Sequence, residues 1–382
     1  MILGPAHVDV VPVTNPEGWK HDPFGGIIED GFMYGRGVLD MLYQVSTQGI
    51  TFIKIKQEKI PLRSNIYLWI VPDEELMGEM GTNWFLKNHK DKLELSEDRE
   101  TFALTEGAGF IMHDYFNFYG VSQKPIWKKL IFNGRASHGA YPLHVNNALV
   151  KASKAAQKFQ EFNDRMDKEA LDLTYVREIA KILSPKMPMV EDLLNENTFA
   201  KGIEELYEKD RILASLLFTM TKTTFSPTII QAGSNPNIVP DKAELSLDIR
   251  AMPNVTEEQI ENQIKEILGE LGKEVIIIKT EKAQNFVQGA VSPADSVLFR
   301  LAKKIVKEKY PEIEFVPFVW GGATDARFCR LEGINCYELG ISDPKTPLSE
   351  VGPAHGTNEK MDLASIDLYL EFLYKLVVEF NK

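Results

Sequence analysis

The chain has 382 residues, a length that suggests two domains, because a single hydrophobic core seldom serves so long a chain. Apolar residues make up 44% and charged residues 26%, a balance typical of globular proteins and not of disordered ones. The 43 Lys and Arg against 55 Asp and Glu give a net charge of −12, and an acidic surface repels phosphate backbones, so we expect no nucleic-acid partner.

Neither a membrane span nor a disulfide framework is predicted. The longest apolar runs, such as 66–71 and 212–220, are far shorter than the roughly 20 residues that a membrane helix needs. The two cysteines, Cys329 and Cys336, form no CxxC motif, which favours a reducing compartment and a cytoplasmic protein. A strand-like segment follows Met1 at once, so we expect that upstream elements of this domain are missing from the sequence.

The first part of the chain, residues 1–121, alternates strand and helix patterns. Residues 66–71 form a short apolar run that is typical of a central strand. A helical pattern follows at 82–88 and a further strand at 101–105. The alternation predicts an α/β domain with a mixed sheet covered by helices, in which ligands gather at the carboxyl ends of strands.

A different pattern occupies residues 122–285, which we interpret as an inserted domain. Its first predicted elements are a strand at 127–132, a helix at 147–162 and a charged helical stretch at 163–222. Two strands follow at 226–232 and 243–250, then a helix that begins at Thr256 (256–261) and a last strand at 274–279. This β-α-β-β-α-β order predicts a ferredoxin-like α+β domain. Residues 286–382 resume the α/β pattern and would complete the first domain.

The residues suited to chemistry lie at strand ends and in Gly-rich loops. His7 ends the opening strand, and Asp9 leaves the same face two residues later, so its carboxylate can orient the imidazole. A histidine hydrogen-bonded in a turn is the plain alternative. Asp40 follows a Gly-rich loop, where a turn or capping residue is equally ordinary.

Three consecutive carboxylates, Asp73, Glu74 and Glu75, follow the predicted strand at 66–71. Such carboxylates repel one another unless cations offset their charge. Because adjacent residues at a strand end point in opposite directions, Glu74 and Glu75 can take separate roles, one at a metal and one facing the reacting water. The alternative is a solvated acidic loop.

Glu106 is another strand-end carboxylate, and His355 supplies a second imidazole late in the chain. Together with His7, Asp40 and Glu75 they make a set of two histidines and three carboxylates. Mixed nitrogen and oxygen ligands in this number suit a pair of divalent ions with one bridging carboxylate.

The motifs that hold these residues occur in a recognisable order over nearly the whole chain: HxDVVP, GRGxxD, PDEE, GxASHGxxP, NxVPD with DxR, GGxTDxR and AHGxNE. This order resembles the aminoacylase/carboxypeptidase family of co-catalytic zinc hydrolases, which includes acetylornithine deacetylase, succinyl-diaminopimelate desuccinylase, glutamate carboxypeptidase and carboxypeptidase S. Residues 19–25 and the helical insert look most like the carboxypeptidase S branch.

The resemblance implies a set of ligands for two divalent ions. Zinc is expected, with cobalt or manganese as alternatives. Asp40 would bridge the two ions. His7 and Glu106 would complete one site, and Glu75 and His355 would complete the other.

The resemblance also implies catalytic roles. Glu74 would be the general base, and Asp9 would support His7. His138, in the inserted domain, would donate a hydrogen bond to the oxyanion in the partner's active site, which implies a homodimer formed through this lid. The Asp40–Met41 peptide should be cis. A strand-end cap is the alternative for His138.

The substrate implied is a small molecule or peptide with a free carboxylate, which Arg250 and Asn237 would bind, while Thr324 and Asp325 would line the pocket. A surface ion pair is the alternative for Arg250. The expected activity is metal-dependent hydrolysis of an N-acyl amino acid or of a C-terminal peptide bond. The rival hypothesis is a metal-binding but inactive, truncated dimeric scaffold.

Overall fold

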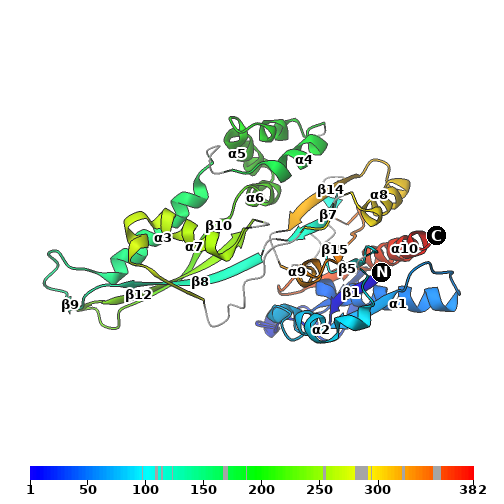
Figure 1. Ribbon diagram of the computed structural model, residues 1–382, viewed down its shortest axis with the longest axis horizontal. Helices are drawn as coiled ribbons and strands as arrows, with labels where there is room; N and C mark the ends of the chain where they lie inside the picture. The colour runs from blue at the N-terminus through cyan, green and yellow to red at the C-terminus, as the bar shows by residue number, and fades with distance from the viewer. Residues whose placement is uncertain are drawn as a thin grey trace. The chain divides into compact units, whose positions relative to one another are not determined.

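The protein is described by a computed structural model that covers residues 1–96, 98–107, 111–112, 115–122, 124–166, 171–185, 187–252, 255–279, 291–293, 295–320, 323–346 and 354–382 (Figure 1). The chain divides into two compact units. Unit 1 consists of Met1–Ser122, Ala290–Val319 and Thr324–Lys382, and unit 2 consists of Gln123–Gly289 and Trp320–Ala323. The domain boundary predicted at 285/286 lies outside the described residues.

Unit 1 is built on a mixed seven-stranded sheet in the order β14-β7-β15-β5-β1-β4, with β6 paired to β7. Strand β1 runs parallel to β4 and to β5, and β15 runs parallel to β5 but antiparallel to β7. The predicted mixed sheet is therefore confirmed. The strands are β1 (Ile2–His7), β4 (Tyr67–Val71), β5 (Phe102–Thr105), β6 (Ile111–Met112), β7 (Tyr115–Ser122), β14 (Glu314–Trp320) and β15 (Asn335–Glu338).

Helices cover this sheet and bury its apolar side chains. They are α1 (Tyr43–Gln57), α2 (Thr82–His89), α8 (Val297–Lys309), α9 (Ala326–Leu331) and α10 (Leu363–Phe380), with short helical turns η1 (Pro16–Gly18), η2 (Val38–Leu42), η3 (Glu74–Leu76) and η4 (Lys90–Leu93). Leu3, Leu104, Tyr337 and Leu373 are fully buried in one cluster that joins β1, β5 and β15 to α10. None of the described helices is long and apolar enough to cross a membrane.

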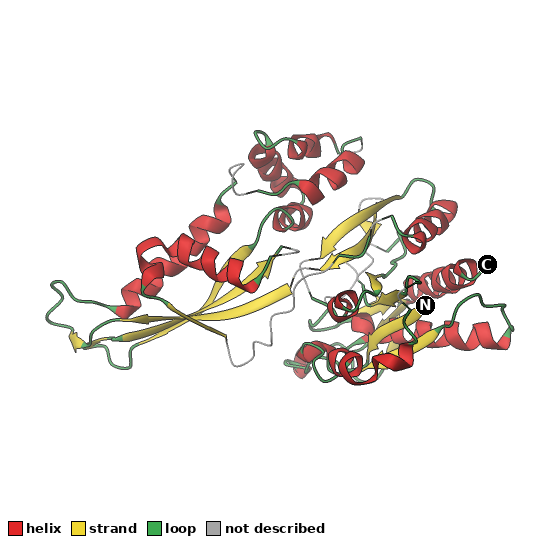
Figure 2. Cartoon of the chain, in the orientation of Figure 1, coloured by secondary structure: helices red, strands yellow, loops and turns green. Residues whose placement is uncertain are grey.

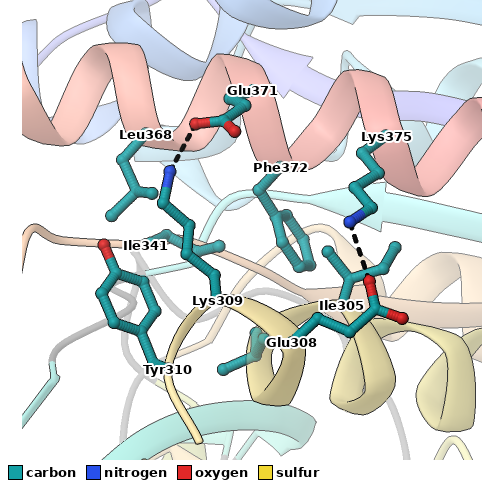
Figure 3. Close-up of a pocket in the computed structure, with 10 residues that line it drawn as sticks. Ile305, Glu308, Lys309, Tyr310, Ile341, Leu368, Glu371, Phe372 and Lys375 are labelled. Atoms are coloured by element: carbon teal, nitrogen blue, oxygen red, sulfur yellow. Dashed lines mark hydrogen bonds and ion pairs between the residues drawn. The ribbon is translucent and has the colours of Figure 1, made fainter.

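A cavity of ≈ 230 Å³ lies between α8 and α10 (Figure 3). Ile341, Leu368 and Phe372 contribute apolar side chains to its wall. Its four charged side chains are paired with one another, Lys309 with Glu371 and Lys375 with Glu308. These charges therefore compensate one another. The groups of clustered metal-ligand side chains found among the described residues do not line this cavity.

A small antiparallel sheet in the order β16-β3-β2 was not predicted. It consists of β2 (Ile27–Glu29), β3 (Phe32–Tyr34) and β16 (Lys360–Asp362). Tyr34 of β3 pairs with Lys360 of β16. The segment that follows β3 is therefore placed beside the segment that precedes β16, although more than 300 residues separate them in the chain.

Unit 2 contains a four-stranded antiparallel sheet in the order β10-β12-β8-β13. Its strands are β8 (Lys124–Asn133), β10 (Thr224–Ala232), β12 (Lys242–Ala251) and β13 (Ile276–Lys279). Helices α3 (Ala148–Asp164) and α7 (Glu257–Leu268) pack on one face, as Figure 2 shows. This arrangement is the predicted ferredoxin-like one.

The sequence pattern of β12 explains which face the helices cover. Ala243, Leu245, Leu247 and Ile249 alternate with polar residues and are buried in the core under α3 and α7. The charged stretch after α3 forms α4 (Thr174–Leu183), η5 (Pro188–Leu194), α5 (Phe199–Lys209) and α6 (Arg211–Thr219), and a short turn η6 (Gly269–Lys273) follows α7. A separate two-stranded pair joins β9 (Ser137–His138) to β11 (Ile238–Val239).

Candidate metal centre

Three neighbouring parallel strands of unit 1 deliver polar side chains to one edge of the sheet. His7 is the last residue of β1 and is paired in register with Val71 of β4. The acidic residues Glu74 and Glu75 follow β4, and Glu106 follows β5. The carboxyl ends of parallel strands meet at the same edge, so the predicted strand-end positions converge here.

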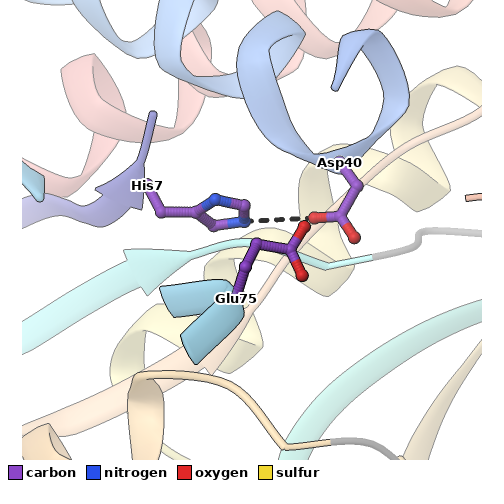
Figure 4. Close-up of side chains that lie close together, drawn as sticks. All are labelled: His7, Asp40 and Glu75. Carbon is purple, nitrogen blue, oxygen red and sulfur yellow. Dashed lines mark hydrogen bonds and ion pairs between the residues drawn. The ribbon is translucent and has the colours of Figure 1, made fainter. Parts of the chain in front are cut away.

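Each histidine faces two carboxylates, and Asp40 is common to both sets. Nε2 of His7 lies 3.1 Å from Oδ1 of Asp40 and 3.0 Å from Oε2 of Glu106. Nε2 of His355 lies 3.0 Å from Oδ2 of Asp40 and 3.1 Å from Oε2 of Glu75. We call these sets the His7 trio and the His355 trio. Figure 4 shows Asp40 and Glu75 turned toward the ring of His7.

The two trios differ in their exposure to solvent. The His7 side chain is 1% exposed, whereas the His355 side chain is 52% exposed. Ligand atoms of His7, Asp40 and Glu75 lie within 4.8 Å of one another, as do those of His7, Glu74 and Glu106. Because a divalent ion binds nitrogen and oxygen at about 2.0–2.2 Å, ligands of one ion lie within about 4 Å of each other, and the trio distances fit that limit.

The charges of the trios stabilise one another. Burial alone would lower the pKa of His7, but the hydrogen bonds with Asp40 and Glu106 outweigh it and raise the pKa to about 12. Hydrogen bonds with Asp40 and Glu75 raise the pKa of His355 to about 10. Burial would raise the pKa of Asp40, but its bonds to both histidines hold it below the usual range.

Glu106 and Glu74 show the opposite shift, with raised pKa values. Burial raises the pKa of Glu106 to about 8, against its hydrogen bond from His7. Burial, together with the nearby charges of Glu106 and Asp325, raises the pKa of Glu74. Carboxylates crowded in this way are stabilised by added positive charge, which is the electrostatic signature expected of a cation site.

Asp9 acts differently from the prediction. Nδ1 of His7 bonds the backbone carbonyl of Asp9 at 2.9 Å, whereas the Asp9 carboxylate is 3.6 Å away. The carboxylate instead accepts hydrogen bonds from the backbone N–H groups of Glu74, at 3.2 Å, and Glu75, at 3.1 Å. The reason is that β1 ends at His7, so Asp9 no longer follows the strand alternation on which the prediction rested.

Asp40 lies in the short π-helical turn η2, directly before α1. The Asp40–Met41 peptide is cis, as the resemblance implied. Gly37 directly precedes this turn and has a φ of +80°, and a Cβ there would lie 2.2 Å from a methyl carbon of Val10. Glycine is therefore required for the close approach of the Asp40 loop to the loop that follows β1.

Thr324 and Asp325, predicted to line the substrate pocket, are only 4% and 1% exposed. The Thr324 hydroxyl donates to Glu338 at 2.8 Å, and Asp325 accepts from the Thr82 hydroxyl at 2.6 Å. The side chains thus fasten the start of α9 to α2 and β15. That Thr324 and Asp325 line the substrate pocket stays a prediction.

His138 and Asn237 meet in unit 2. His138 lies in β9 opposite Ile238, and the N–H of Gly139 donates to the carbonyl of Asn237 at 2.8 Å. The His138 side chain is exposed, and its Nδ1 accepts from the N–H of Ala140 at 3.1 Å. The contact with an oxyanion stays a prediction.

Arg250 lies near the end of β12 and is paired with an acidic neighbour. It lies in β12 eight residues beyond Lys242, a distance of about 26 Å along a strand. Its guanidinium makes two hydrogen bonds with Asp248, Nε to Oδ1 at 2.7 Å and Nη2 to Oδ2 at 2.9 Å. That Arg250 and Asn237 bind one substrate carboxylate stays a prediction.

Arg36 and Glu359 were not predicted to be functional residues, although they belong to the GRGxxD and AHGxNE motifs. They form a buried ion pair between the Asp40 loop and the loop of His355. The available signal was a charged residue within each ligand motif. The sequence does not show that Arg36 and Glu359 pair, because their contact depends on the pairing of β3 with β16.

The chain is similar to known proteins over nearly its whole length. The sequence profile of Peptidase family M20/M25/M40 matches residues 5–379. Aminoacylase-1 of Sus scrofa is 26% identical over 383 residues, which cover 98% of this chain and 79% of that protein. The N-fatty-acyl-amino acid synthase/hydrolase PM20D1 of Bos taurus is 25% identical, with 97% of this chain and 72% of that protein covered.

Among solved structures, the M20 family metallo-carboxypeptidase Sso-CP2 from Sulfolobus solfataricus has a similar fold. The two superpose with a TM-score of 0.70 and 18% sequence identity, covering 99% of this chain and 84% of that one. At this identity the likeness concerns the fold.

Proposed function

The chain belongs to Peptidase family M20/M25/M40, and on this premise we propose that it is a metal-dependent hydrolase of amide bonds in N-acyl amino acids or at the carboxyl end of peptides. The observation that carries the proposal is the shared position of Asp40 between two histidine–carboxylate trios. The names of its relatives, an aminoacylase, an N-fatty-acyl-amino acid hydrolase and a metallo-carboxypeptidase, support the reaction class.

The trios suit two divalent ions. His7 and Glu106 would hold one, His355 and Glu75 the other, and Asp40 both, a nitrogen and oxygen ligand set typical of zinc, with cobalt and manganese as alternatives. Such ions would polarise the scissile carbonyl and make water acidic enough to attack near neutral pH.

The protein's own residues would move the proton. Glu74 would take a proton from the attacking water as the water oxygen bonds to the carbonyl carbon. It would then deliver that proton to the nitrogen as the carbon–nitrogen bond breaks. Asp9 contributes by holding the backbone of Glu74 and Glu75 so that the two carboxylates keep separate positions.

The inserted domain would complete the site in a homodimer. His138 is exposed in unit 2 and can donate a hydrogen bond to the oxyanion, a role worth roughly 10²–10³ in rate for one donor. Arg250 would bind the substrate carboxylate, exchanging its bonds to Asp248 for bonds to substrate. Membership of the carboxypeptidase S branch is part of the same proposal.

A hydrolysis panel tests the proposal. The metal-depleted protein is reloaded with zinc, cobalt or manganese and assayed on N-acetyl amino acids, on dipeptides, and on matched amides that lack the free carboxylate. We expect hydrolysis only with metal and only of substrates with a free carboxylate. A protein that binds two ions but hydrolyses no member of the panel would instead support the inactive scaffold.

A further inference from the structure

Arg36 and Glu359 connect the two loops that carry Asp40 and His355. Their side chains are 2% and 1% exposed and form an ion pair. Antiparallel pairing of β3 with β16 leads directly into the pair, because the N–H of Gly35 donates to the carbonyl of Glu359 at 3.1 Å. The pair therefore sits where the two loops diverge toward the metal centre.

Each member of the pair holds the backbone of the other member's loop. The carboxylate of Glu359 accepts from the N–H groups of Gly37 at 3.1 Å, Leu39 at 3.0 Å and Asp40 at 3.2 Å. The Arg36 guanidinium donates from Nη2 to the carbonyls of His355 and Gly356. The contact thus reaches the backbone of both ligands themselves, Asp40 and His355.

The loop of His355 has a backbone conformation that residues other than glycine rarely adopt. His355 has a φ of +64° and Asn358 a φ of +61°, both in the left-handed region. The ring of Trp19, which is 9% exposed, stacks over the guanidinium of Arg36 at 5.3 Å. A buried ion pair is seldom a net source of stability, since desolvation offsets the attraction, so its placement here calls for another reason.

We propose that Arg36 and Glu359 are positioning residues that set the spacing between Asp40 and His355, and that they control metal binding at the His355 trio more than at the His7 trio. The inference rests on the proposed dimetal function. The His355 trio contains two ligands held by the pair, whereas the His7 trio contains only Asp40. His7 and Glu106 are placed instead by β1 and β5.

Two variants test the role. Glu359→Gln keeps the shape but has one acceptor oxygen in place of two, so it cannot serve all three N–H groups and Arg36 together. Arg36→Lys keeps the charge but lacks the forked nitrogens that reach His355 and Gly356. The control is Glu338→Gln, a carboxylate 1% exposed that pairs with Arg330 at 3.3 Å in the same unit, outside both loops.

The readout is metal binding and does not depend on activity. The metal-depleted proteins are titrated with zinc and cobalt by calorimetry to measure the affinity for each ion, and their metal content is measured by mass spectrometry. Parent protein should bind two ions. In both variants we expect the affinity for one ion, which we assign to the His355 trio, to fall about 10–100-fold, the usual effect of losing a partner that orients metal ligands. The affinity for the other ion should fall less. Glu338→Gln should lower the melting temperature without this selective loss.

Parent protein that fails to bind two ions would refute the proposed function itself. Variants that bind both ions like the parent, while melting earlier as Glu338→Gln does, would show that the pair is merely structural. Equal losses for both ions would refute the assignment to the His355 trio. Should Glu359→Gln fail to fold by circular dichroism, the milder Arg36→Lys decides alone.

Discussion

Replacing Glu74 and Glu75 separately by glutamine distinguishes the proposed base from the proposed ligand. Both side chains follow β4 and are isosteric with their replacements, so packing changes little. Glu75 contacts His355, at 3.1 Å, whereas Glu74 has its ligand atom within 4.8 Å of those of His7 and Glu106. The position of Glu74 near His7 would also suit a metal ligand. The two variants decide whether Glu74 is the general base or a ligand.

The magnitudes expected follow from these positions. A general base contributes about 10²–10⁴ in rate, which corresponds to about 2.7–5.4 kcal/mol of transition-state stabilisation. Glu74→Gln should therefore lower kcat by about that factor while both ions stay bound, since neither trio includes it. Glu75→Gln removes one of the three members of the His355 trio and should release one ion.

The assay combines metal content with the kinetics of hydrolysis of an N-acetyl amino acid. Each variant is dialysed against a low concentration of zinc, and the bound metal is counted per chain before kcat is measured. The reasoning is refuted if Glu74→Gln loses an ion while Glu75→Gln keeps both. In that case the roles of the two carboxylates must be exchanged.

Metal loading should release protons, because His7 and His355, with pKa values of about 12 and 10, are protonated at pH 7 without metal, and ligation needs neutral imidazole. Calorimetry in buffers of different ionisation enthalpy should find about two protons or more per chain at pH 7, with affinity falling as pH falls. Mixing His138→Ala with Glu74→Ala should restore some activity, since a mixed dimer would contain one site with both residues intact. Gly78→Ala should lower the melting temperature strongly, because a Cβ there would lie 1.9 Å from a buried carboxylate oxygen.

Controls make these three outcomes decisive. Release of less than one proton would mean that the histidines are already neutral in the metal-free protein. Lack of recovery, despite demonstrated subunit exchange, would place His138 outside the partner's site. Gly31 also has a positive φ, +80° against +64° for Gly78, but no atom lies within 4 Å of a Cβ added there. An equal loss in Gly31→Ala and Gly78→Ala would therefore attribute the effect to backbone conformation alone.

Local sequence pattern was enough to predict the strand ends that build the centre. An apolar run that stops before charged residues marks the end of a buried strand, so the positions of Glu74, Glu75 and Glu106 followed from their neighbours. The alternation in β12 likewise identified its buried face. The resemblance then paired Asp40 with both histidines, and the structure places these groups about 3 Å apart.

Tertiary structure alone decided the contacts between segments far apart in the chain. Asp9 holds the amides of Glu74 and Glu75 because β1 ends two residues before it, and no periodicity reveals where a strand stops pairing. Arg36 and Glu359 meet because β3 pairs with β16, a register that no local preference sets. Local propensity acts over a few residues, whereas these contacts depend on which strands become neighbours once the hydrophobic core has formed.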